Sequence, residues 1–164
     1  MVLTIRPAGN ADADAIWEVF HTVVATADTY AYPADTPREQ ALAWWFPAGG
    51  WTFVALIDDR TVGTYVMKPN QPGQGGHVAN CGYMVAPEAS GRGVGEAMCR
   101  HSLVEARRLG FLAMQFNFVV STNTRAVSLW KRCGFEIVGT LPRAFRHPSH
   151  GLVDAYVMHQ HLEP

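Results

Sequence analysis

The chain has 164 residues, of which 48% are hydrophobic and 16% charged, and its formal net charge is −1. This length suits one domain over residues 1–164 that buries about two-thirds of its unfolded surface. A charge this close to zero argues against a nucleic-acid binder. The sequence contains no uninterrupted run of about 20 apolar residues, so it does not predict a membrane-spanning helix. The three cysteines lack C-x-x-C spacing, so we expect reduced thiols in a cytoplasmic protein.

The first 50 residues predict one strand followed by two helices. Residues 1–7 are typical of a strand that enters a turn. Asn10 is a predicted N-cap for a helix whose apolar residues recur at helical spacing. Residues 30–35 are rich in aromatic residues and proline and predict a loop. The capping box at residues 36–39, with proline in the first helical position, then begins a short second helix.

The central part of the chain predicts a hairpin, a further strand and a long helix. Residues 51–58 and 61–68 form the hairpin around a turn at Asp59-Arg60. After a glycine- and proline-rich loop, residues 78–85 predict a strand that leads into a glycine-rich turn. A helix follows from residue 94 to about residue 109, where Gly110 ends it.

The last third predicts a strand, a helix and two more strands. Residues 114–120 predict a strand that is rich in apolar residues and interrupted by Asn117, and Thr122 or Asn123 caps the helix. A loop over residues 142–151 joins the last two strands, at residues 135–139 and 155–159. The complete order, β-α-α-β-β-β-α-β-α-β-β, argues for a mixed α/β domain with a parallel pair of strands around the helix that begins at Val94.

The glycine-rich turn at residues 90–95, Ser-Gly-Arg-Gly-Val-Gly, is the most informative segment of the chain. A strand that feeds such a turn and then a helix presents a row of unpaired backbone N–H groups beside the positive end of the helix dipole. Glycines carry no Cβ, so a phosphate can approach the main chain closely. The turn therefore predicts a pyrophosphate site, although the same pattern also occurs in tight turns without a ligand.

Three motifs in this order resemble the GCN5-related N-acetyltransferase (GNAT) family. They are the opening Ile5-Arg6-Pro7 before a helix, the strand-turn-helix at residues 83–98, and the stretch from Asn123 to Phe135, close to N-x-x-A-x-x-L-Y-x-x-x-G-F. The resemblance spans nearly the whole chain. It implies a mixed sheet of about six or seven strands with helices on both faces, and acetyl-CoA as the acetyl donor.

The resemblance also implies where acetyl-CoA would bind. The pantetheine arm would pair with the strand at residues 83–85, and the Val85 N–H would lie near the developing oxyanion, where an oriented donor contributes about 3 kcal/mol. Asn123 matches an asparagine that contacts the cofactor arm. The implied cofactor-binding residues are Tyr83, Met84, Val85, Gly91, Arg92, Gly93, Val94, Gly95, Glu96 and Asn123.

A narrower resemblance covers residues 63–154 and looks like the acetyltransferases that detoxify proline analogues such as azetidine-2-carboxylate. It rests on segments such as Lys68-Pro69-Asn70, residues 77–80 and residues 116–119. The resemblance implies that Asn80 serves catalysis or substrate binding and that the backbone amides of Asn117 and Phe118 hold the substrate carboxylate. It implies a small-molecule amine as the acceptor, such as an amino acid or a proline-like imino acid.

Three positions depart from the broader family pattern. Ser90 stands where many members have glutamine or arginine, and Ala79-Asn80 stands where many carry a glutamate base. Trp130 replaces a tyrosine that protonates the leaving thiolate, and an indole cannot supply that proton. A thiol with a pKa of about 8.5 leaves tolerably without full proton assistance, so water or another donor can suffice.

Other interpretations stay open. The acceptor could be a protein N-terminus or a lysine, although the region from Tyr30 to Trp51 is bulky enough to close a peptide groove. A chain without an evident acid or base could also be an acyl-CoA sensor that does not turn over its ligand. We expect no metal, because the histidine pairs at residues 147 and 150 and at residues 159 and 161 do not obviously converge. A homodimer is possible.

Structural roles compete with these functional ones at several positions. Asn80 could be only a hydrogen-bonding residue at a strand edge, Asn117 could mark a bulge, and Asn123 could be only a helix cap. Trp44 and Trp45, with Tyr30 and Tyr32, could roof an acceptor pocket, but helix packing explains at least one of the tryptophans.

Overall fold

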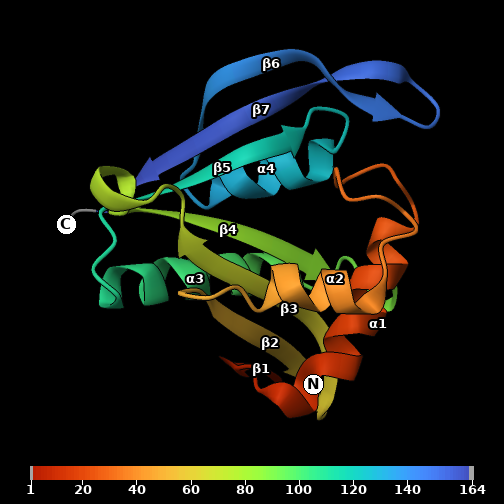
Figure 1. Ribbon diagram of the computed structural model, residues 1–164, viewed down its shortest axis with the longest axis vertical. Helices are drawn as coiled ribbons and strands as arrows, with labels where there is room; N and C mark the ends of the chain where they lie inside the picture. The colour runs from red at the N-terminus through yellow and green to blue at the C-terminus, as the bar shows by residue number, and fades with distance from the viewer. Residues whose placement is uncertain (1, 163–164) are drawn as a thin grey trace.

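The computed structural model describes residues 2–162, so Met1, which begins the first predicted strand, and residues 163–164 lie outside it. These residues form one seven-stranded sheet with the order β1-β2-β3-β4-β5-β7-β6 (Figure 1). Every neighbouring pair is antiparallel except β4 and β5, which are parallel. The strands are β1 (Leu3–Pro7), β2 (Trp51–Ile57), β3 (Arg60–Pro69), β4 (Val78–Val85), β5 (Ala113–Val120), β6 (Glu136–His147) and β7 (Gly151–His161).

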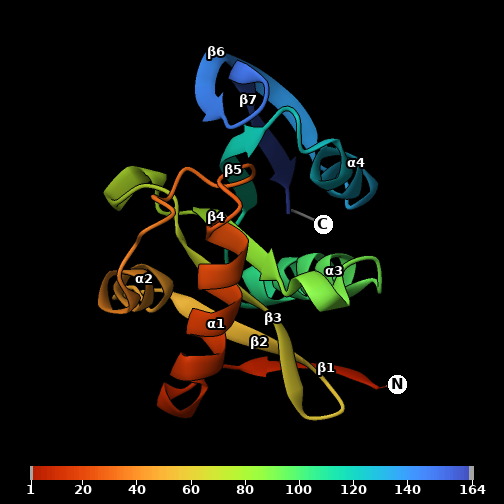
Figure 2. The same cartoon turned by 90° about the vertical axis from the view of Figure 1, so that its right-hand side faces the viewer.

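Four helices cover the two faces of the sheet, as Figure 2 shows. They are α1 (Ala13–Val24), α2 (Arg38–Trp45), α3 (Val94–Arg108) and α4 (Thr124–Arg132), with short 3₁₀ turns η1 (Asn10–Asp12), η2 (Gly73–Gly75) and η3 (Pro87–Ala89). The observed order of helices and strands confirms the predicted one, including the parallel pair around α3. The mixed sheet with helices on both faces is the fold that the resemblance implies.

Strand periodicity divides the hydrophobic core into two layers. Successive side chains of a strand point to opposite faces. Val54, Val66 and Met84 accordingly pack with the apolar residues of α1 and α2. Their neighbours on the same strands, of which Tyr65 and Tyr83 are examples, pack with α3 and α4.

The parallel strands β4 and β5 diverge soon after they meet. They pair only where Val78, Ala79 and Asn80 face Ala113, Met114 and Gln115. Beyond this point β4 runs on to Val85 and β5 to Val120 without pairing to each other, and Figure 1 shows the two strands spreading apart. The two strands form a fork whose apex is the Asn80–Gln115 pair, and their backbone edges inside the fork have no strand partner.

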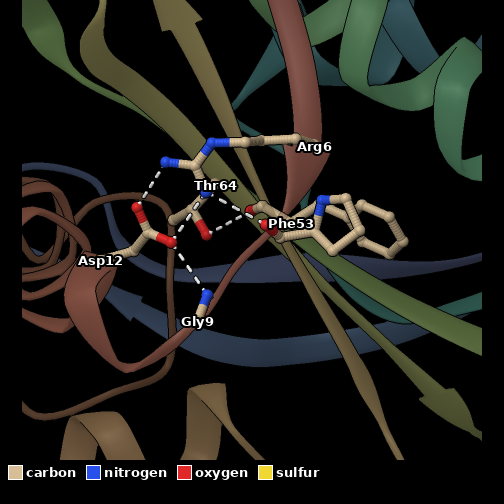
Figure 3. Close-up of polar contacts among 6 residues, drawn as sticks. Arg6, Gly9, Asp12, Phe53 and Thr64 are labelled. Carbon is tan, nitrogen blue, oxygen red and sulfur yellow. Dashed lines mark hydrogen bonds and ion pairs between the residues drawn. The ribbon is translucent and has the colours of Figure 1, made fainter.

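An ion pair fixes the first strand to the first helix. The Asp12 carboxylate accepts hydrogen bonds from both terminal nitrogens of Arg6, at 2.8 and 2.9 Å, and from the Gly9 N–H at 2.8 Å (Figure 3). This carboxylate folds the chain into the turn η1, with Gly9 before it and α1 beginning only at Ala13. The prediction of Asn10 as N-cap is therefore wrong, because the Asp12 carboxylate, and not the Asn10 side chain, accepts the hydrogen bond from the backbone before the helix.

Other predicted boundaries shift for local reasons. The Thr36 hydroxyl donates to the Pro33 carbonyl and does not cap α2, which begins at Arg38 after Pro37. The β2–β3 turn lies at Asp58 and Asp59, both of which have positive φ, one residue earlier than predicted.

The hairpin of β6 and β7 is much longer than predicted. Residues 142–147, expected in a loop, belong to β6, and the connection shortens to residues 148–150. Pro142 is tolerated because β6 is the edge strand of the sheet, where a missing N–H costs no ladder hydrogen bond. A register shift between Leu141 and Phe145, with Arg143 at φ 51°, absorbs the proline.

Candidate active site

A cavity of about 880 Å³ fills the fork between β4 and β5. Its walls come from these two strands, the glycine-rich turn, the first residues of α3, and α4. Residues 29–32, in the loop between α1 and α2, close it from the other side of the sheet. The cavity is large enough for a cofactor arm together with a small acceptor.

The fold brings nearly all of the predicted site residues to this one cavity. Arg92 alone among them is not part of the lining, and it is exposed. The predicted residues that line the cavity are Asn80, Tyr83, Met84, Val85, Gly91, Gly93, Val94, Gly95, Glu96, Asn117, Phe118 and Asn123.

The glycine-rich turn has the geometry of an anion site. Gly91 and Gly93 adopt φ values of 79° and 81°, a left-handed conformation that favours glycine, and α3 begins directly afterwards at Val94. A Cβ on Gly95 would lie 3.2 Å from the Leu129 side chain, so glycine also allows α3 and α4 to approach closely. The first residues of this 15-residue helix, Val94, Gly95 and Glu96, line the cavity, and the first N–H groups of a helix have no partner within the helix.

Two backbone amides of β4 point into the fork. The Ala86 N–H donates to the Val62 carbonyl of β3 at 2.8 Å. Because successive N–H groups of a strand point to opposite edges, the Met84 N–H also faces β3, whereas those of Tyr83 and Val85 face β5 across the fork. An extended ligand arm can therefore pair with β4 as an added strand would.

Arg125, which the sequence patterns did not single out, stands over the glycine-rich turn. Its guanidinium donates to the Ser90 hydroxyl at 3.0 Å, and it lies 3.2 Å from the position that a Gly91 Cβ would occupy. The small Ser90 side chain leaves room for this arginine from α4. Its place two residues after the cap Asn123 was the only available signal, and a spacing on α4 does not predict a contact with residue 90.

Two further arginines at this end of the cavity share the carboxylate of Glu96. Arg100 donates two hydrogen bonds to Glu96, at 2.7 and 3.0 Å, and Arg132 lies 3.7 Å from the same carboxylate. The hydrogen bonds from Arg100 lower the pKa of Glu96. Among the described residues that line the cavity, the only charged side chains are Glu96, Arg125 and Arg132.

Asn80 lies at the apex of the fork. Its side-chain amide donates to the Gln115 carbonyl at 3.1 Å, across the last paired position of β4 and β5. Asn80 therefore makes a hydrogen bond at the strand edge, which is the structural role considered for it in the sequence analysis. It holds the side chain at the inner end of the cavity, with its carbonyl oxygen available to a ligand.

Asn117 and Phe118 form a bulge in β5. Between Phe116 and Val119 the strand advances one residue more than its partner β7, and both bulged residues are exposed. The Asn117 side chain donates to Asn70 at 2.7 Å and accepts from Gln115 at 2.9 Å. A neutral amide network thus holds the bulge over the cavity.

Asn123 caps α4. Its side-chain oxygen accepts from the Ala126 N–H at 3.3 Å. The expected cap is therefore Asn123 and not Thr122, and the same residue lines the cavity.

Trp130 is an apolar wall of the cavity. Its ring lies 4.9 Å from that of Tyr83 and 5.1 Å from that of Phe116, measured between centroids. The Tyr83 hydroxyl points away from the fork and bonds to Ser102 of α3 at 2.6 Å, and burial raises its pKa. Neither ring offers an acid to the fork.

Tyr30 and Tyr32 form the roof, and the two tryptophans do not line the cavity. The rings of Tyr30 and Tyr32 stack at 5.9 Å, and Trp44 stacks on Tyr32 at 4.9 Å. Trp45 is buried, and its indole N–H donates to the Thr64 hydroxyl at 2.8 Å. Core packing thus accounts for Trp45, and Trp44 supports the roof from behind.

Of the described cysteines and histidines, only Cys81 lines the cavity. Cys81, Cys99 and Cys133 are buried and free, and burial raises the pKa of the Cys81 thiol to about 12. Within residues 2–162 no cluster of three or more histidine, cysteine or acidic side chains is placed to hold a metal ion. Over the same residues, no helix has both the length and the apolar character needed to cross a bilayer.

Comparison with known proteins identifies the class to which this fold and cavity belong. The sequence model described as the acetyltransferase (GNAT) family matches residues 17–135. The chain therefore belongs to the GNAT family of acetyltransferases. The structure of a GCN5-related N-acetyltransferase from Kribbella flavida is 47% identical, covers 97% of each chain and superposes with a TM-score of 0.93.

More distant relatives share the fold or part of the sequence. An acetyltransferase from Salmonella typhimurium, solved with its cofactor acetyl-CoA, is 23% identical, with a TM-score of 0.87 over 100% of this chain and 96% of that one. N-acetyltransferase aca1 of Schizosaccharomyces pombe is 37% identical over 111 residues, which are 66% of this chain and 53% of aca1. Mycothiol acetyltransferase of Geodermatophilus obscurus is 36% identical over 104 residues, 62% of this chain and 33% of that protein. The chain thus spans about half of the first curated relative and a third of the second.

Proposed function

We propose that the protein transfers the acetyl group of acetyl-CoA to the amine of a small molecule, an amino acid or a proline-like imino acid. The observation that carries this proposal is the two-ended cavity of the fork. Arginines and free helix amides stand at one end, and neutral amides stand at the other. The first end suits a diphosphate, and the second suits an uncharged or zwitterionic acceptor.

Acetyl-CoA would enter from the glycine-rich turn. Its pyrophosphate would accept hydrogen bonds from Arg125 and from the amides of residues 91–96, except that of Arg92, which donates to the Ala89 carbonyl at 3.3 Å. Its pantetheine arm would pair with the fork-facing amides of Tyr83 and Val85. The Val85 N–H would stabilise the oxyanion, a contribution of about 3 kcal/mol for a preorganised donor. The acetyl-CoA in the related Salmonella structure supports this choice of donor.

The acceptor would occupy the inner end of the fork. A carboxylate there would meet the backbone amides of the Asn117–Phe118 bulge, while the amine would face Asn80. Among the described lining residues no charged side chain stands at this end, so a polyamine or a dianion would be desolvated without a counter-charge. This selection favours an amino or imino acid over a lysine-rich or dianionic acceptor.

The reaction would be direct attack within a ternary complex. The amine lone pair forms the C–N bond, the C–S bond breaks, and one proton passes overall from nitrogen to sulfur. Holding both reactants in one cavity supplies much of the rate acceleration. Asn80, as an amide, would orient the amine and would not deprotonate it.

A panel of amines assayed for release of free CoA tests the proposal. We expect turnover of azetidine-2-carboxylate, proline or a related amino acid, and weaker turnover of peptides and polyamines. Asn80→Ala should lower kcat/KM roughly tenfold, the equivalent of one hydrogen bond, whereas the exposed Asn10→Ala control should not change it. If a peptide N-terminus or a lysine were acetylated faster than any small amine, the acceptor would be a protein and not a small molecule. Tight acetyl-CoA binding without transfer to any amine would instead indicate a sensor.

The proposal extends to the setting of the enzyme. An acetyltransferase for proline analogues would serve detoxification, and three free, buried cysteines suit a reducing cytoplasm. We further propose that the enzyme forms a homodimer, for which size determination in solution is the direct test.

A further inference from the structure

We propose that Asn70 is a positioning residue for the acceptor: it holds the β5 bulge so that the backbone amides of Asn117 and Phe118 can bind a carboxylate. This inference deepens the proposed acetyl transfer and rests on it. It makes a carboxylate beside the amine a requirement of the acceptor. It also gives a function to the segment Lys68-Pro69-Asn70, to which the proposed reaction assigns none.

Strand pairing alone does not fix this bulge. The register of β5 with β7 passes from Phe116 directly to Val119, and the pairing of β5 with β4 already ends at Gln115. Over the described residues, Asn117 and Phe118 therefore have no register partner on either side. A bulge leaves its residues outside the regular ladder of the sheet. The direction of the two backbone amides thus depends on side-chain contacts.

A chain of side-chain amides holds the bulge instead. Gln115 donates to the Asn117 side-chain oxygen at 2.9 Å, and the Asn117 side-chain nitrogen donates to the Asn70 side-chain oxygen at 2.7 Å. Asn70 is itself fixed, because it directly follows β3 and its backbone N–H donates to the Val78 carbonyl of β4 at 2.8 Å. The bulge is therefore tied to the β3–β4 connection as well as to its own strand.

The same chain of amides reaches Asn80 at the apex of the fork. Asn80 and Gln115 lie opposite each other in the parallel pair, and the Asn80 side chain donates to the Gln115 carbonyl at 3.1 Å. Because Asn117 lies two residues beyond Gln115, strand alternation places all three side chains on one face of the sheet. Met84, four residues after Asn80, is on this face and packs in the layer that also contacts the roof tyrosines. Gln115 thus fixes the side chain that would orient the amine relative to the bulge that would bind the carboxylate.

An anion is the ligand that suits these donors. The chain of amides is neutral, and the described lining at this end of the cavity has no carboxylate that would repel an anion. Backbone N–H groups only donate hydrogen bonds, and an ammonium group also only donates them, so a polyamine would leave the bulge amides unpaired. A carboxylate accepts hydrogen bonds from both amides. Recognition at the bulge therefore requires a carboxylate near the amine, as an amino or imino acid provides.

Kinetics of Asn70→Ala with an acid and its carboxamide test this role. The substitution removes the partner of the Asn117 side chain, and Asn70 is not part of the cavity lining. We expect KM for the best amino- or imino-acid acceptor to rise about tenfold, as for a weakened hydrogen bond to a charged group. The value of kcat should stay unchanged, because the carboxylate is held equally in the ground state and the transition state. KM for acetyl-CoA and for the carboxamide of the same acceptor should keep their wild-type values.

A double substitution gives an independent measurement. Asn117→Ala breaks the same hydrogen bond from its other side, so the addition of Asn70→Ala should raise KM for the acid no further. Gln74→Ala is the matched control, because it removes an exposed side-chain amide from the same loop. It should leave every constant unchanged.

The outcomes separate this inference from the proposed function. A wild-type KM in Asn70→Ala, equal rises in KM for the acid and its carboxamide, or additive effects in the double variant would overturn this inference alone. A wild-type protein that prefers an amine without a carboxylate would also overturn it, and would leave acetyl transfer to a small molecule in place. A wild-type protein that acetylates no amine would overturn the proposed function, and this inference with it.

Discussion

At the scale of single residues, the glycine-rich turn has a serine at position 90, and an arginine from α4, Arg125, lies beside it. Ser90 carries no charge, and Arg125 from α4 lies over it, with its guanidinium 3.0 Å from the serine hydroxyl. A planar guanidinium can bond two phosphate oxygens at once, which serine cannot do. In the proposed complex, an arginine from another helix would therefore supply the positive charge at the turn.

Arg125→Gln should weaken acetyl-CoA binding without slowing the chemical step. We expect KM for acetyl-CoA to rise roughly tenfold, since a charge-assisted hydrogen bond contributes about 1.5 kcal/mol and this one is partly exposed to solvent. The value of kcat at saturating donor should not change, because Arg125 lies at the far end of the cavity from Asn80. Steady-state kinetics with varied acetyl-CoA measures both constants.

Two controls make the Arg125 experiment specific. Arg108→Gln removes an exposed arginine that pairs with Glu105 at the other end of α3, and it should leave KM unchanged. Acetyl-pantetheine lacks the diphosphate, so wild type and Arg125→Gln should use it equally well. If Arg125→Gln raised the KM for acetyl-pantetheine as much as the KM for acetyl-CoA, Arg125 would support the fold of the turn and would not bind the diphosphate.

At the scale of elements, the link between β1 and α1 depends on one buried carboxylate. The Asp12 side chain is 10% exposed, whereas that of Arg6 is 49% exposed, so solvent screens the pair only from one side (Figure 3). The hydrogen bonds from Arg6 lower the pKa of Asp12 from its ordinary value of 3.8. The ionised carboxylate therefore stabilises the folded state.

Asp12→Asn should destabilise the fold by about 1–2 kcal/mol at neutral pH, because an amide can accept only some of the hydrogen bonds that Arg6 and Gly9 donate to the carboxylate. Since the folded-state pKa lies below 3.8, the contribution of Asp12 is fully present above that pH and is lost as the pH falls through the folded pKa. Urea unfolding of wild type and variant from pH 7 to pH 2.5 measures the difference.

The matched control for this experiment is Asp14→Asn. Asp14 also pairs with an arginine, Arg38, but its side chain is 93% exposed. We expect that substitution to leave the free energy of unfolding nearly unchanged at every pH. A constant difference between wild type and Asp12→Asn down to pH 2.5 would show that packing, and not the charge of Asp12, fixes the first strand.

The elements also show how far the sequence predicts this fold. Strand β4 has its predicted ends, and the glycine-rich turn and the cap Asn123 are signals confined to a few neighbouring residues. The N-cap at Asn10 failed because a non-local partner, Arg6, holds Asp12. The predicted end of β6 was wrong because pairing with β7 extends the strand through Pro142, a residue that local sequence rules assign to a loop.

The same distinction applies to the site. Motifs indicated many of the residues that line the cavity, because the family resemblance carries positions over one by one. Arg125 was missed because its contact with residue 90 depends on the packing of α4 against α3. Tyr30 was considered as part of a roof, but its place in the cavity lining depends on the α1–α2 loop folding over the sheet.

At the scale of the whole molecule, the charges of the cavity are divided between its two ends. Arginine side chains and Glu96 gather at the glycine-rich turn, and the acceptor end of the described lining is made of amides, hydroxyls and rings. His101 and His159 have a pKa that burial lowers, and neither lines the cavity. The described lining thus contains no histidine or other group that ordinarily ionises near neutral pH, so in the proposed reaction the amine would have to arrive without its proton.

This arrangement predicts that the pH dependence belongs to the acceptor. The value of kcat/KM for the amine should rise about tenfold per pH unit and level off at the pKa of that amine, because only its free base attacks. Two acceptors whose amines differ in pKa should give profiles displaced by that difference. The Kd of CoA, measured over the same pH range, is the control and should stay constant where its phosphates do not titrate. An inflection at one fixed pH for both acceptors would reveal an ionising base on the protein, and the search for it would begin with the histidines nearest the fork.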